Sequence, residues 1–285
     1  MILRARQFQF SFPGPALVMG VLNVTPDSFS DGGQFLDPRV AVAHGLRLVD
    51  HGAAILDVGG ESSRPGAMAV DEVEELRRVV PVIKRLAESV SVPISVDTVK
   101  VEVARAALDA GASIINDVGA DREDSALWKL LAETGAGYVC MHRKGTPPTM
   151  QSNPAYADVV SEVREFFLER LQRMEDCGLG RDQTILDPGI GFGKGLEHNL
   201  RLLGALRDFA ALQRPLLIGV SRKSFIGKLL GTDIAARLPG ALACASQAVA
   251  SGAQIIRAHD VTETVGAIRM TEAILANQRI ECGKS

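Results

Sequence analysis

The sequence predicts an α/β fold, a single (β/α)8 barrel of the TIM type, and three observations lead to this prediction. The chain has 285 residues, an ordinary length for such a barrel. Eight short apolar runs alternate with segments in which apolar residues recur every three or four positions. Four of these helix-like segments end in the same Gly-Ala pair, directly before the next apolar run.

The eight apolar runs are expected to be the strands. They are rich in β-branched residues and nearly continuous in hydrophobicity, as expected of parallel strands buried on both faces. They cover residues 16–22, 54–59, 93–98, 113–118, 137–142, 184–189, 215–221 and 254–259. Residues 1–15 precede the first strand and leave room for a short N-terminal hairpin that would close the bottom of the barrel.

The helix-like segments end in a way that favours regular βα units. Gly52, Gly111, Gly135 and Gly252 each precede an alanine that opens the next strand. Glycine is favoured at such a position because the left-handed conformation that ends many helices suits a residue without a side chain. No linker or change in composition divides the chain, so we expect one domain over residues 1–285, with the barrel at about 16–278. A doubly wound sheet is the alternative that the pattern leaves open.

Composition and charge narrow the class of protein. Hydrophobic residues make up 46% of the chain, charged residues 23%, and the net charge is −3. No run of lysine and arginine points to nucleic acid, and no segment has the length and apolar content of a signal peptide or a membrane span. The cysteines are far apart, which fits reduced thiols in the cytoplasm rather than disulfides or a zinc site; they are Cys140, Cys177, Cys244 and Cys282. Cys140 and Cys244 lie in apolar runs and are expected in the core.

Polar side chains recur where the predicted strands end. A single one could be a helix cap or a turn residue, but one at every strand end favours a shared pocket. The positions are Asn23, Asp57, Asp97, Asn116, His142, Asp187, Ser221 and His259. Long loops follow at the same end, over residues 24–36, 59–69, 143–155, 188–196 and 221–227, as expected of a catalytic face.

Eight motifs at these positions carry a resemblance to a known family. In order they are NVTPDSFSDGG, GGESSRPGA, SVDT, NDV, MHRKGTPPTMQ, DPGIGFGK, SRKSFIG and RAHDV. Together, from about Gly20 to the last helix, they resemble the dihydropteroate synthase family of folate biosynthesis. The resemblance implies a transferase that joins 6-hydroxymethyl-7,8-dihydropterin diphosphate to p-aminobenzoate, giving 7,8-dihydropteroate and diphosphate. It also implies a TIM-type barrel, Mg2+, small-molecule substrates and a homodimer.

The resemblance assigns six residues to the pterin. They are Asp97, Asn116, Met141, Asp187, Lys223 and Arg257. A pterin presents an exocyclic amine and a ring N–H side by side, and one ionised carboxylate, here Asp187, can accept from both. Asn116 offers a donor and an acceptor, Lys223 can donate to the ring, and the planar guanidinium of Arg257 could stack on its face.

The diphosphate is assigned a second set of residues by the same resemblance. They are Asn23, Ser63, Arg64, Arg257 and His259. Asn23 is also the expected protein ligand of Mg2+, an ion that usually takes only one or two ligands from the protein. Arg257 and His259 lie two residues apart on a strand, so their side chains are expected on the same side.

The p-aminobenzoate pocket is expected to draw on the first two long loops and on two later ones. Its residues would be Pro26, Phe29, Ser63, Pro65, Phe192 and Ser224. Catalysis is expected from electrostatic stabilisation of a departing diphosphate and a pterin cation, without a side-chain nucleophile. The catalytic residues would then be Asp97, Lys223, Arg257 and His259.

The chain departs from the family pattern in places, and two other functions stay open. Ser63 stands where the family usually has threonine, and Arg143 and Lys144 add charges that we expect at a solvated rim. One alternative is a methyltetrahydrofolate–corrinoid methyltransferase, which would share the pterin-edge residues but has no need for the diphosphate donors. The other is a non-catalytic pterin-binding paralogue, which should have lost Asn23, Lys223 or His259.

Overall fold

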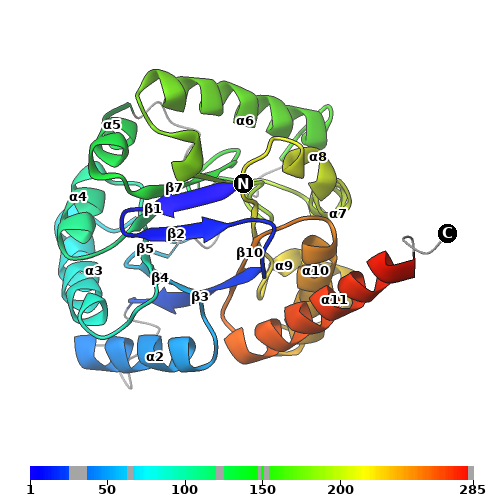
Figure 1. Cartoon of the computed structure of the whole chain (residues 1–285), viewed down its shortest axis with the longest axis horizontal. Coiled ribbons are helices and arrows are strands. Elements are labelled where there is room, and N and C mark those ends of the chain that lie inside the picture. The colour runs from blue at the N-terminus through cyan, green and yellow to red at the C-terminus, as the bar shows by residue number, and fades with distance from the viewer. Residues whose placement is uncertain are drawn as a thin grey trace.

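The structure, a computed structural model, is an eight-stranded parallel barrel surrounded by helices (Figure 1). It describes residues 1–25, 37–62, 67, 69–119, 125–146, 149–150 and 154–281, and side chains as far as residue 278. The strands are β3 (Leu17–Asn23), β4 (Ile55–Gly59), β5 (Ile94–Asp97), β6 (Ile114–Asp117), β7 (Gly137–Met141), β8 (Thr184–Asp187), β9 (Leu217–Gly219) and β10 (Ile255–Ala258). The barrel fold predicted from the sequence is therefore confirmed, and the doubly wound sheet is wrong.

The paired strands form an almost complete ring. The order is β8-β7-β6-β5-β4-β3-β10-β9, with every neighbouring pair parallel. A single bridge between Leu186 and Leu216 joins the β8 side to the β9 side, so the barrel is nearly closed. Register matters for function, because Gly59 lies beside Asn23 on one flank and beside Asp97 on the other.

The helices form the outer ring (Figure 1). They are α2 (Pro38–Asp50), α3 (Glu72–Ala87), α4 (Val101–Asp109), α5 (Ser125–Thr134), α6 (Val159–Asp176), α7 (Leu196–Gly204), α8 (Leu206–Ala210), α9 (Ser224–Leu230), α10 (Leu238–Ala250) and α11 (Val261–Glu281). Two short 3-10 turns, η1 (Arg181–Gln183) and η2 (Ala235–Arg237), complete the described elements.

Local chemistry explains where several helices begin and end. Aspartate side chains at positions 37, 71 and 158 accept backbone N–H groups at the starts of α2, α3 and α6. At the other ends, Gly52, Gly111, Gly135 and Gly252 have φ values of 98°, 113°, 68° and 97°. These values confirm the glycine stops predicted from the sequence.

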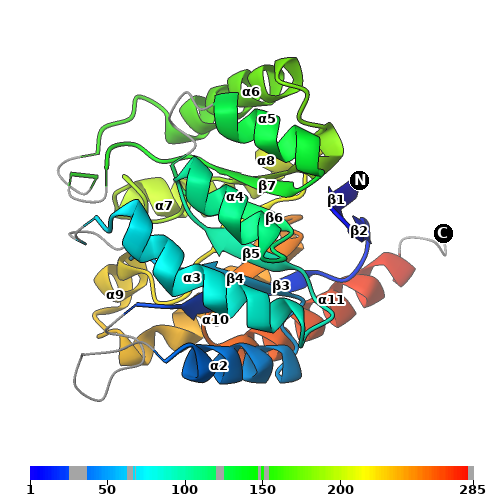
Figure 2. The ribbon, with the colours of Figure 1, turned by 90° about the vertical axis from the view of Figure 1, so that its left-hand side faces the viewer.

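An N-terminal hairpin closes one end of the barrel. Strands β1 (Ile2–Ala5) and β2 (Phe8–Ser11) pair antiparallel. Leu3, Ala5 and Phe12 are buried in one cluster with inward-facing residues of the barrel strands. Figure 2 shows this hairpin at the end of the barrel opposite α9. The predicted closure of the bottom is confirmed, and it leaves the other end for the carboxyl ends of the strands.

The larger core lies between the barrel strands and the surrounding helices. It includes Trp128, Phe167 and Phe209, each almost fully buried. Cys140 is buried in it as expected, whereas Cys244 is only half-buried and packs at its edge. Among the helices that the structure describes, none is long and apolar enough to cross a membrane.

Candidate active site

The predicted polar strand ends meet at one end of the barrel, which we call the mouth. It is the end where the strands finish, at Asn23, Gly59, Asp97, Asp117, Met141, Asp187, Gly219 and Ala258. Parallel strands bring their carboxyl ends together, so residues far apart in sequence face one space. The described contacts at the mouth join Asp57 and Asp97 to Arg257, and join Lys223 to the loop after β8.

Arg257 is held between two carboxylates on neighbouring strands. Its Nε donates to Asp57 Oδ2 at 2.6 Å and its Nη2 to Asp97 Oδ2 at 3.1 Å. Asn116 Nδ2 also donates to Asp57 Oδ2, at 3.0 Å. This contact directs the amide nitrogen toward Asp57 and leaves Asn116 Oδ1 as the acceptor available to a ligand.

Burial governs the protonation of this group. It raises the pKa of Asp97 to about 7; Arg257 opposes the rise, while Asp57, Glu75 and Asp117 reinforce it. Burial alone would lower the pKa of Arg257, but the carboxylates of Asp57 and Asp97 raise it overall. Arg257 is therefore a fixed positive charge, whereas Asp97 can change charge near neutral pH.

Asp57 is a residue whose role the sequence did not assign. The sequence places it among the polar strand ends and indicates no role for it in binding or catalysis. It is fully buried, and its Oδ1 has no hydrogen-bond partner among the described residues. Its Oδ2 orients both Arg257 and Asn116. The signal for this role in the sequence is a carboxylate two residues before the end of an apolar strand.

Asp187, the last residue of β8, forms the opposite edge of the site. Its Oδ1 accepts the backbone N–H of Gly189 at 2.7 Å, and it lies beside Met141 in the sheet. Burial raises the pKa of Asp187, opposed by the Gly189 N–H and by the charges of Lys223, Lys194 and Arg257. Met141 is buried next to this carboxylate, where the resemblance places the pterin ring.

Lys223 stands at the entry to α9, and the backbone before it is in an unusual conformation. Arg222 has a φ of 61°, and its guanidinium pairs with Asp260 at 2.8 Å. Lys223 Nζ lies 3.9 Å from the centre of the Phe192 ring. Burial and the nearby Arg257 lower the pKa of Lys223 to about 8, despite the opposing carboxylates.

The remaining predicted residues at the mouth are arranged around β3, β9 and β10. His259 contacts Ser221 twice: its backbone N–H donates to Ser221 Oγ at 3.2 Å, and its Nδ1 lies 3.0 Å from the same oxygen. Asn23 is half-buried, and a Cβ placed on Gly59 would lie 3.8 Å from Asn23 Oδ1. The absence of a side chain at Gly59 therefore keeps the space beside Asn23 open.

A buried lysine that the sequence did not single out lies behind the loop after β8. Lys194 is 2% exposed, and its Nζ contacts His142 Nδ1 at 3.0 Å, the His142 carbonyl at 3.2 Å and the Phe192 carbonyl at 3.0 Å. Burial, with smaller contributions from Lys194 and Lys144, lowers the pKa of His142 to about 2. His142 is therefore a neutral ring whose Nδ1 accepts from the lysine.

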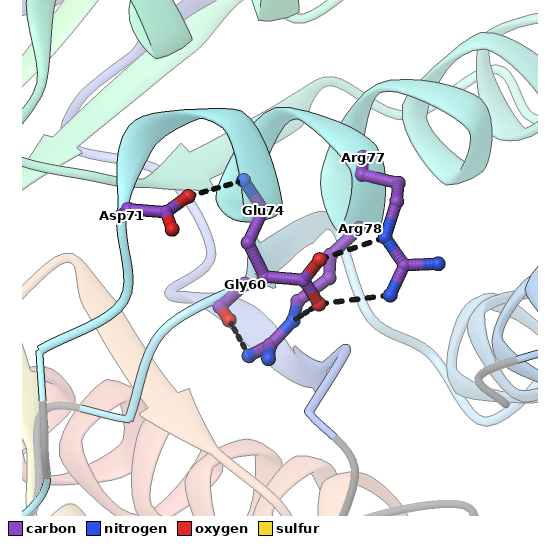
Figure 3. A network of polar contacts seen from close by, with 5 residues as sticks. All are labelled: Gly60, Asp71, Glu74, Arg77 and Arg78. Atoms are coloured by element: carbon purple, nitrogen blue, oxygen red, sulfur yellow. Dashed lines mark hydrogen bonds and ion pairs between the residues drawn. The ribbon is translucent and has the colours of Figure 1, made fainter. Parts of the chain in front are cut away.

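The start of the loop after β4 is fastened to α3. Figure 3 shows Arg78 donating to the Gly60 carbonyl at 2.8 Å while also pairing with Glu74 at 2.8 Å. Glu74 is further held by Arg77, and its backbone N–H donates to Asp71. Lys100 bridges Glu61 and the buried Glu75. These contacts fix residues 60 and 61, which lie shortly before Ser63 and Arg64 in the sequence.

Several predicted residues have a different status. Pro26, Phe29, Ser63, Arg64 and Pro65 lie outside the described residues. Ser224 is exposed as the first residue of α9, beside Lys223. Lys144 is exposed, as expected of a solvated rim, and it also pairs with Glu162 at 3.2 Å and lies over the Tyr156 ring at 4.3 Å. Its neighbour Arg143 is half-buried.

The arrangement as a whole suits a flat, polar, cation-forming ligand with an anionic group. Three buried carboxylates, Asp57, Asp97 and Asp187, lie at the mouth with the cations Arg257 and Lys223. Such a set can accept ring N–H groups, donate to ring oxygens and tolerate positive charge that develops on a bound ring. Among the described residues, no group of three or more His, Cys, Asp or Glu side chains could hold a metal by itself.

Comparisons with known proteins agree with a site for a ligand of this kind. A family model described as "Pterin binding enzyme" matches residues 19–259. Dihydropteroate synthase of Escherichia coli strain K12 is 51% identical over 267 residues, covering 93% of this chain and 94% of that protein.

Two solved structures are similarly close. One is a dihydropteroate synthase of Yersinia pestis in a sulfonamide drug complex, with a TM-score of 0.90, 44% identity and coverage of 97% of this chain and 100% of that one. The other is the Xanthomonas albilineans enzyme in complex with 7,8-dihydropteroate, with a TM-score of 0.86, 42% identity and coverage of 96% and 99%.

Proposed function

This chain belongs to the dihydropteroate synthase family of pterin-binding enzymes, and on that premise we propose how its residues share the work of the reaction. The enzyme is a transferase of folate biosynthesis. It condenses 6-hydroxymethyl-7,8-dihydropterin diphosphate with p-aminobenzoate, and it releases 7,8-dihydropteroate and diphosphate. The observation that carries this conclusion is the agreement over nearly the whole chain with proteins of that activity.

The pterin is held by its polar edge in this proposal. Asp187 accepts the exocyclic amine and the adjacent ring N–H, and Asn116 Oδ1 accepts a further N–H. Lys223 donates to the ring, while Arg257 faces it with a guanidinium held by Asp57 and Asp97. The burial of Asp97 and Asp187 supports this assignment, and so does the orientation that Asp57 imposes on the Asn116 amide. Met141 supplies apolar contact beside Asp187.

The diphosphate and Mg2+ are assigned to the β3 and β10 side of the mouth. Asn23 offers one neutral oxygen, and the side-chain-free Gly59 keeps the space next to it open. One such ligand fits Mg2+ that arrives with a phosphorylated substrate, because the ion keeps waters and substrate oxygens as its other ligands. When bound, Mg2+ would neutralise negative charge on the leaving diphosphate. His259, fixed by Ser221, and Arg257 donate to the same group.

The reaction then proceeds without a side-chain nucleophile from the protein. As the C–O bond to diphosphate breaks, Asp97 and Asp187 offset the positive charge left on the pterin. The p-aminobenzoate nitrogen attacks the exposed methylene carbon and loses a proton to complete the new C–N bond. Phe192, whose ring covers Lys223, supports the aryl group, and Ser224 lies at the entrance near its carboxylate.

Two further properties belong to this proposal. We assign the enzyme to the cytoplasm, in keeping with the free thiols of Cys140, Cys177 and Cys244. We also assign it a homodimeric state. The support is a set of large, exposed apolar side chains at the end of α9, in the segment after it and on α11, namely Leu229, Leu230, Ile234, Met270 and Ile274.

One assay tests the function against its alternatives. Diphosphate release is measured with pterin diphosphate alone, with p-aminobenzoate alone and with both, each with and without Mg2+. Release that requires both substrates and Mg2+ is the expected result. Methyl transfer from methyltetrahydrofolate to cobalamin without diphosphate release would instead identify a corrinoid methyltransferase. Pterin binding without turnover would identify a non-catalytic paralogue.

A further inference from the structure

Lys194 is a buried cation that the proposed mechanism does not use. Its ammonium has three N–H donors, and the structure gives it three acceptors: His142 Nδ1, the His142 carbonyl and the Phe192 carbonyl. A neutral histidine ring is required for Nδ1 to accept, and burial keeps His142 neutral by lowering its pKa to about 2. Burial lowers the pKa of Lys194 to about 7, so the lysine carries its charge and all three donors below that pH.

The same lysine lies next to the backbone that holds Asp187. Gly189 donates its N–H to Asp187 Oδ1 at 2.7 Å, and a Cβ placed on Gly189 would lie 3.3 Å from Lys194 Nζ. The His142 N–H in turn donates to the Asp187 carbonyl at 2.9 Å. Lys194 is therefore bonded to His142 and lies close to Gly189, the two residues that bond the carbonyl and the carboxylate of Asp187, and no hydrogen bond from Lys194 to that carboxylate is described.

We propose that Lys194 is a positioning residue of the pterin site, whose buried ammonium keeps Asp187 ionised and ties the loop after β8 to the end of β7. This inference rests on the proposed role of Asp187 as the acceptor for the pterin edge. A protonated Asp187 could not accept two N–H groups from the ring. A buried carboxylate needs nearby positive charge to stay ionised, and Lys194 provides some of it from the protein side.

A test of this inference must separate the effect of Lys194 on Asp187 from the effects of the other charges nearby. The charged groups around Asp187 are Lys194 after β8, Lys223 at the start of α9 and Arg257 on β10, with the titratable Cys140 on β7 and His142 after it. Lys223 and Arg257 are assigned to the ligand itself, so replacing them would remove ligand contacts as well as charge. No ligand contact is assigned to Lys194. Its replacement by methionine removes the charge together with three hydrogen bonds, and Lys194→Arg, which keeps the charge, separates the two effects.

The experiment measures binding of 6-hydroxymethylpterin, which lacks the diphosphate, by calorimetry between pH 4 and 6. This range lies below the pKa of about 7 of both Lys194 and Asp97, so Lys194 stays charged and Asp97 stays protonated throughout. Wild type is compared with Lys194→Met, with Lys144→Met as the matched control, and with Asp187→Asn. Lys144 lies in the neighbouring loop, but it is about half exposed and pairs with Glu162. Thermal unfolding is followed in parallel to confirm that each variant folds.

The sign follows from the charge removed. Loss of the ammonium raises the pKa of Asp187, so the acidic loss of affinity should move to higher pH in Lys194→Met, by roughly one unit. At a pH below the midpoints of both proteins, this shift should make Lys194→Met bind the pterin about tenfold more weakly than a variant that kept the wild-type midpoint. Lys144→Met should keep the wild-type midpoint, and Asp187→Asn should bind weakly with no acidic limb.

Each outcome has a definite meaning. A midpoint in Lys194→Met equal to that of wild type overturns the inference, even if affinity falls uniformly, because a purely structural role would give that result. If Lys194→Met does not fold, Lys194→Gln carries the same expectation and Lys194→Arg, which keeps the charge, should keep the midpoint. If Asp187→Asn binds like wild type, the proposed function of Asp187 fails instead.

Discussion

Asp97 and Lys223 are a pair of residues whose pKa values are displaced toward each other. Burial raises the pKa of Asp97 to about 7 and lowers that of Lys223 to about 8. In the proposed mechanism Asp97 works as the anion and Lys223 as the cation. Each group is therefore in its working form only on one side of its own pKa, and the two ranges overlap between the two values.

This displacement predicts a narrow bell-shaped pH profile for kcat/KM with pterin diphosphate. Activity should fall as pH drops through about 7, because Asp97 gains a proton. It should also fall as pH rises through about 8, because Lys223 loses one. Initial rates between pH 5.5 and 9.5 measure both limbs, and they report the pair rather than isolated groups.

Two variants assign the limbs of this profile. Asp97→Asn should lower the maximum and remove the acidic limb, which separates the enzyme from any titration of the diphosphate in the substrate. Lys223→Arg should remove the alkaline limb, because a guanidinium stays charged throughout this range. An acidic limb that persists unchanged in Asp97→Asn would contradict the assignment.

At the scale of elements, the loop after β8 depends on glycines that approach a neighbouring loop closely. Gly193 has a φ of 63°, and a Cβ placed there would lie 2.1 Å from the Lys144 carbonyl oxygen. Phe192 and Lys194 flank it, so this close approach sets the position of both side chains. Gly135 has a similar φ of 68° but nothing within 4 Å of an added Cβ.

These two glycines form a matched test. Gly135→Ala should lower the free energy of unfolding by about 1 kcal/mol, the cost of a left-handed conformation for alanine, and should leave kcat/KM unchanged. Gly193→Ala should cost about 3 kcal/mol, because the clash adds to the same conformational cost, and should lower kcat/KM. Chemical denaturation and initial rates measure both quantities. Equal losses in the two variants would show that contact with Lys144 is unimportant.

The N-terminal hairpin stabilises the protein at the end of the barrel opposite the mouth. Leu3 is fully buried among the inward-facing strand residues, whereas Ile2 beside it is 40% exposed. Leu3→Ala should lower the free energy of unfolding by about 3 kcal/mol, and Ile2→Ala should change it little. Both should keep wild-type kcat/KM well below the unfolding temperature. A large loss of activity in folded Leu3→Ala would mean that the bottom of the barrel also shapes the mouth.

At the scale of the whole molecule, the sequence was most informative where one local rule decides the structure. Parallel strands buried on both faces are continuous apolar runs, so the predicted and observed barrel strands agree to within two residues at every end, as in Ile55–Gly59 and Gly137–Met141. The helix stops at Gly52 and Gly252 were predictable for a similar reason, because a left-handed residue favours glycine.

The sequence was silent where the structure depends on register across the barrel. Arg257 pairs with Asp57 from a position 200 residues away, and only the order and register of β4, β5 and β10 bring the two together. Lys194 lies between glycines and has the character of a solvent-exposed loop residue. Its burial follows from the backbone approach of two loops, which no local pattern encodes.

The apolar face near α11 leads to a prediction about assembly. Met270 and Ile274 are 64% and 53% exposed on this helix, and with Ala273, Asn277 and Gln278 they line an open hollow of about 460 Å³. Leu230 at the end of α9 reaches Gly240 of α10, which packs along α11. Exposed apolar area of this kind is costly in water unless another surface covers it. A second copy of the chain is the partner that we propose.

Charge placed on this face should therefore separate the two copies. Ile274→Glu should convert a dimer into a monomer at micromolar concentration, measured by size exclusion with light scattering, because an unpaired carboxylate would be buried in the interface. Val73→Glu is the matched control: Val73 is 76% exposed on α3, across the ring of helices from α11 (Figure 1). Because the mouth is built from the strand ends of a single barrel, the monomer should keep its kcat/KM. A wild-type monomer, or a dimer that survives Ile274→Glu, would place the interface elsewhere or remove it.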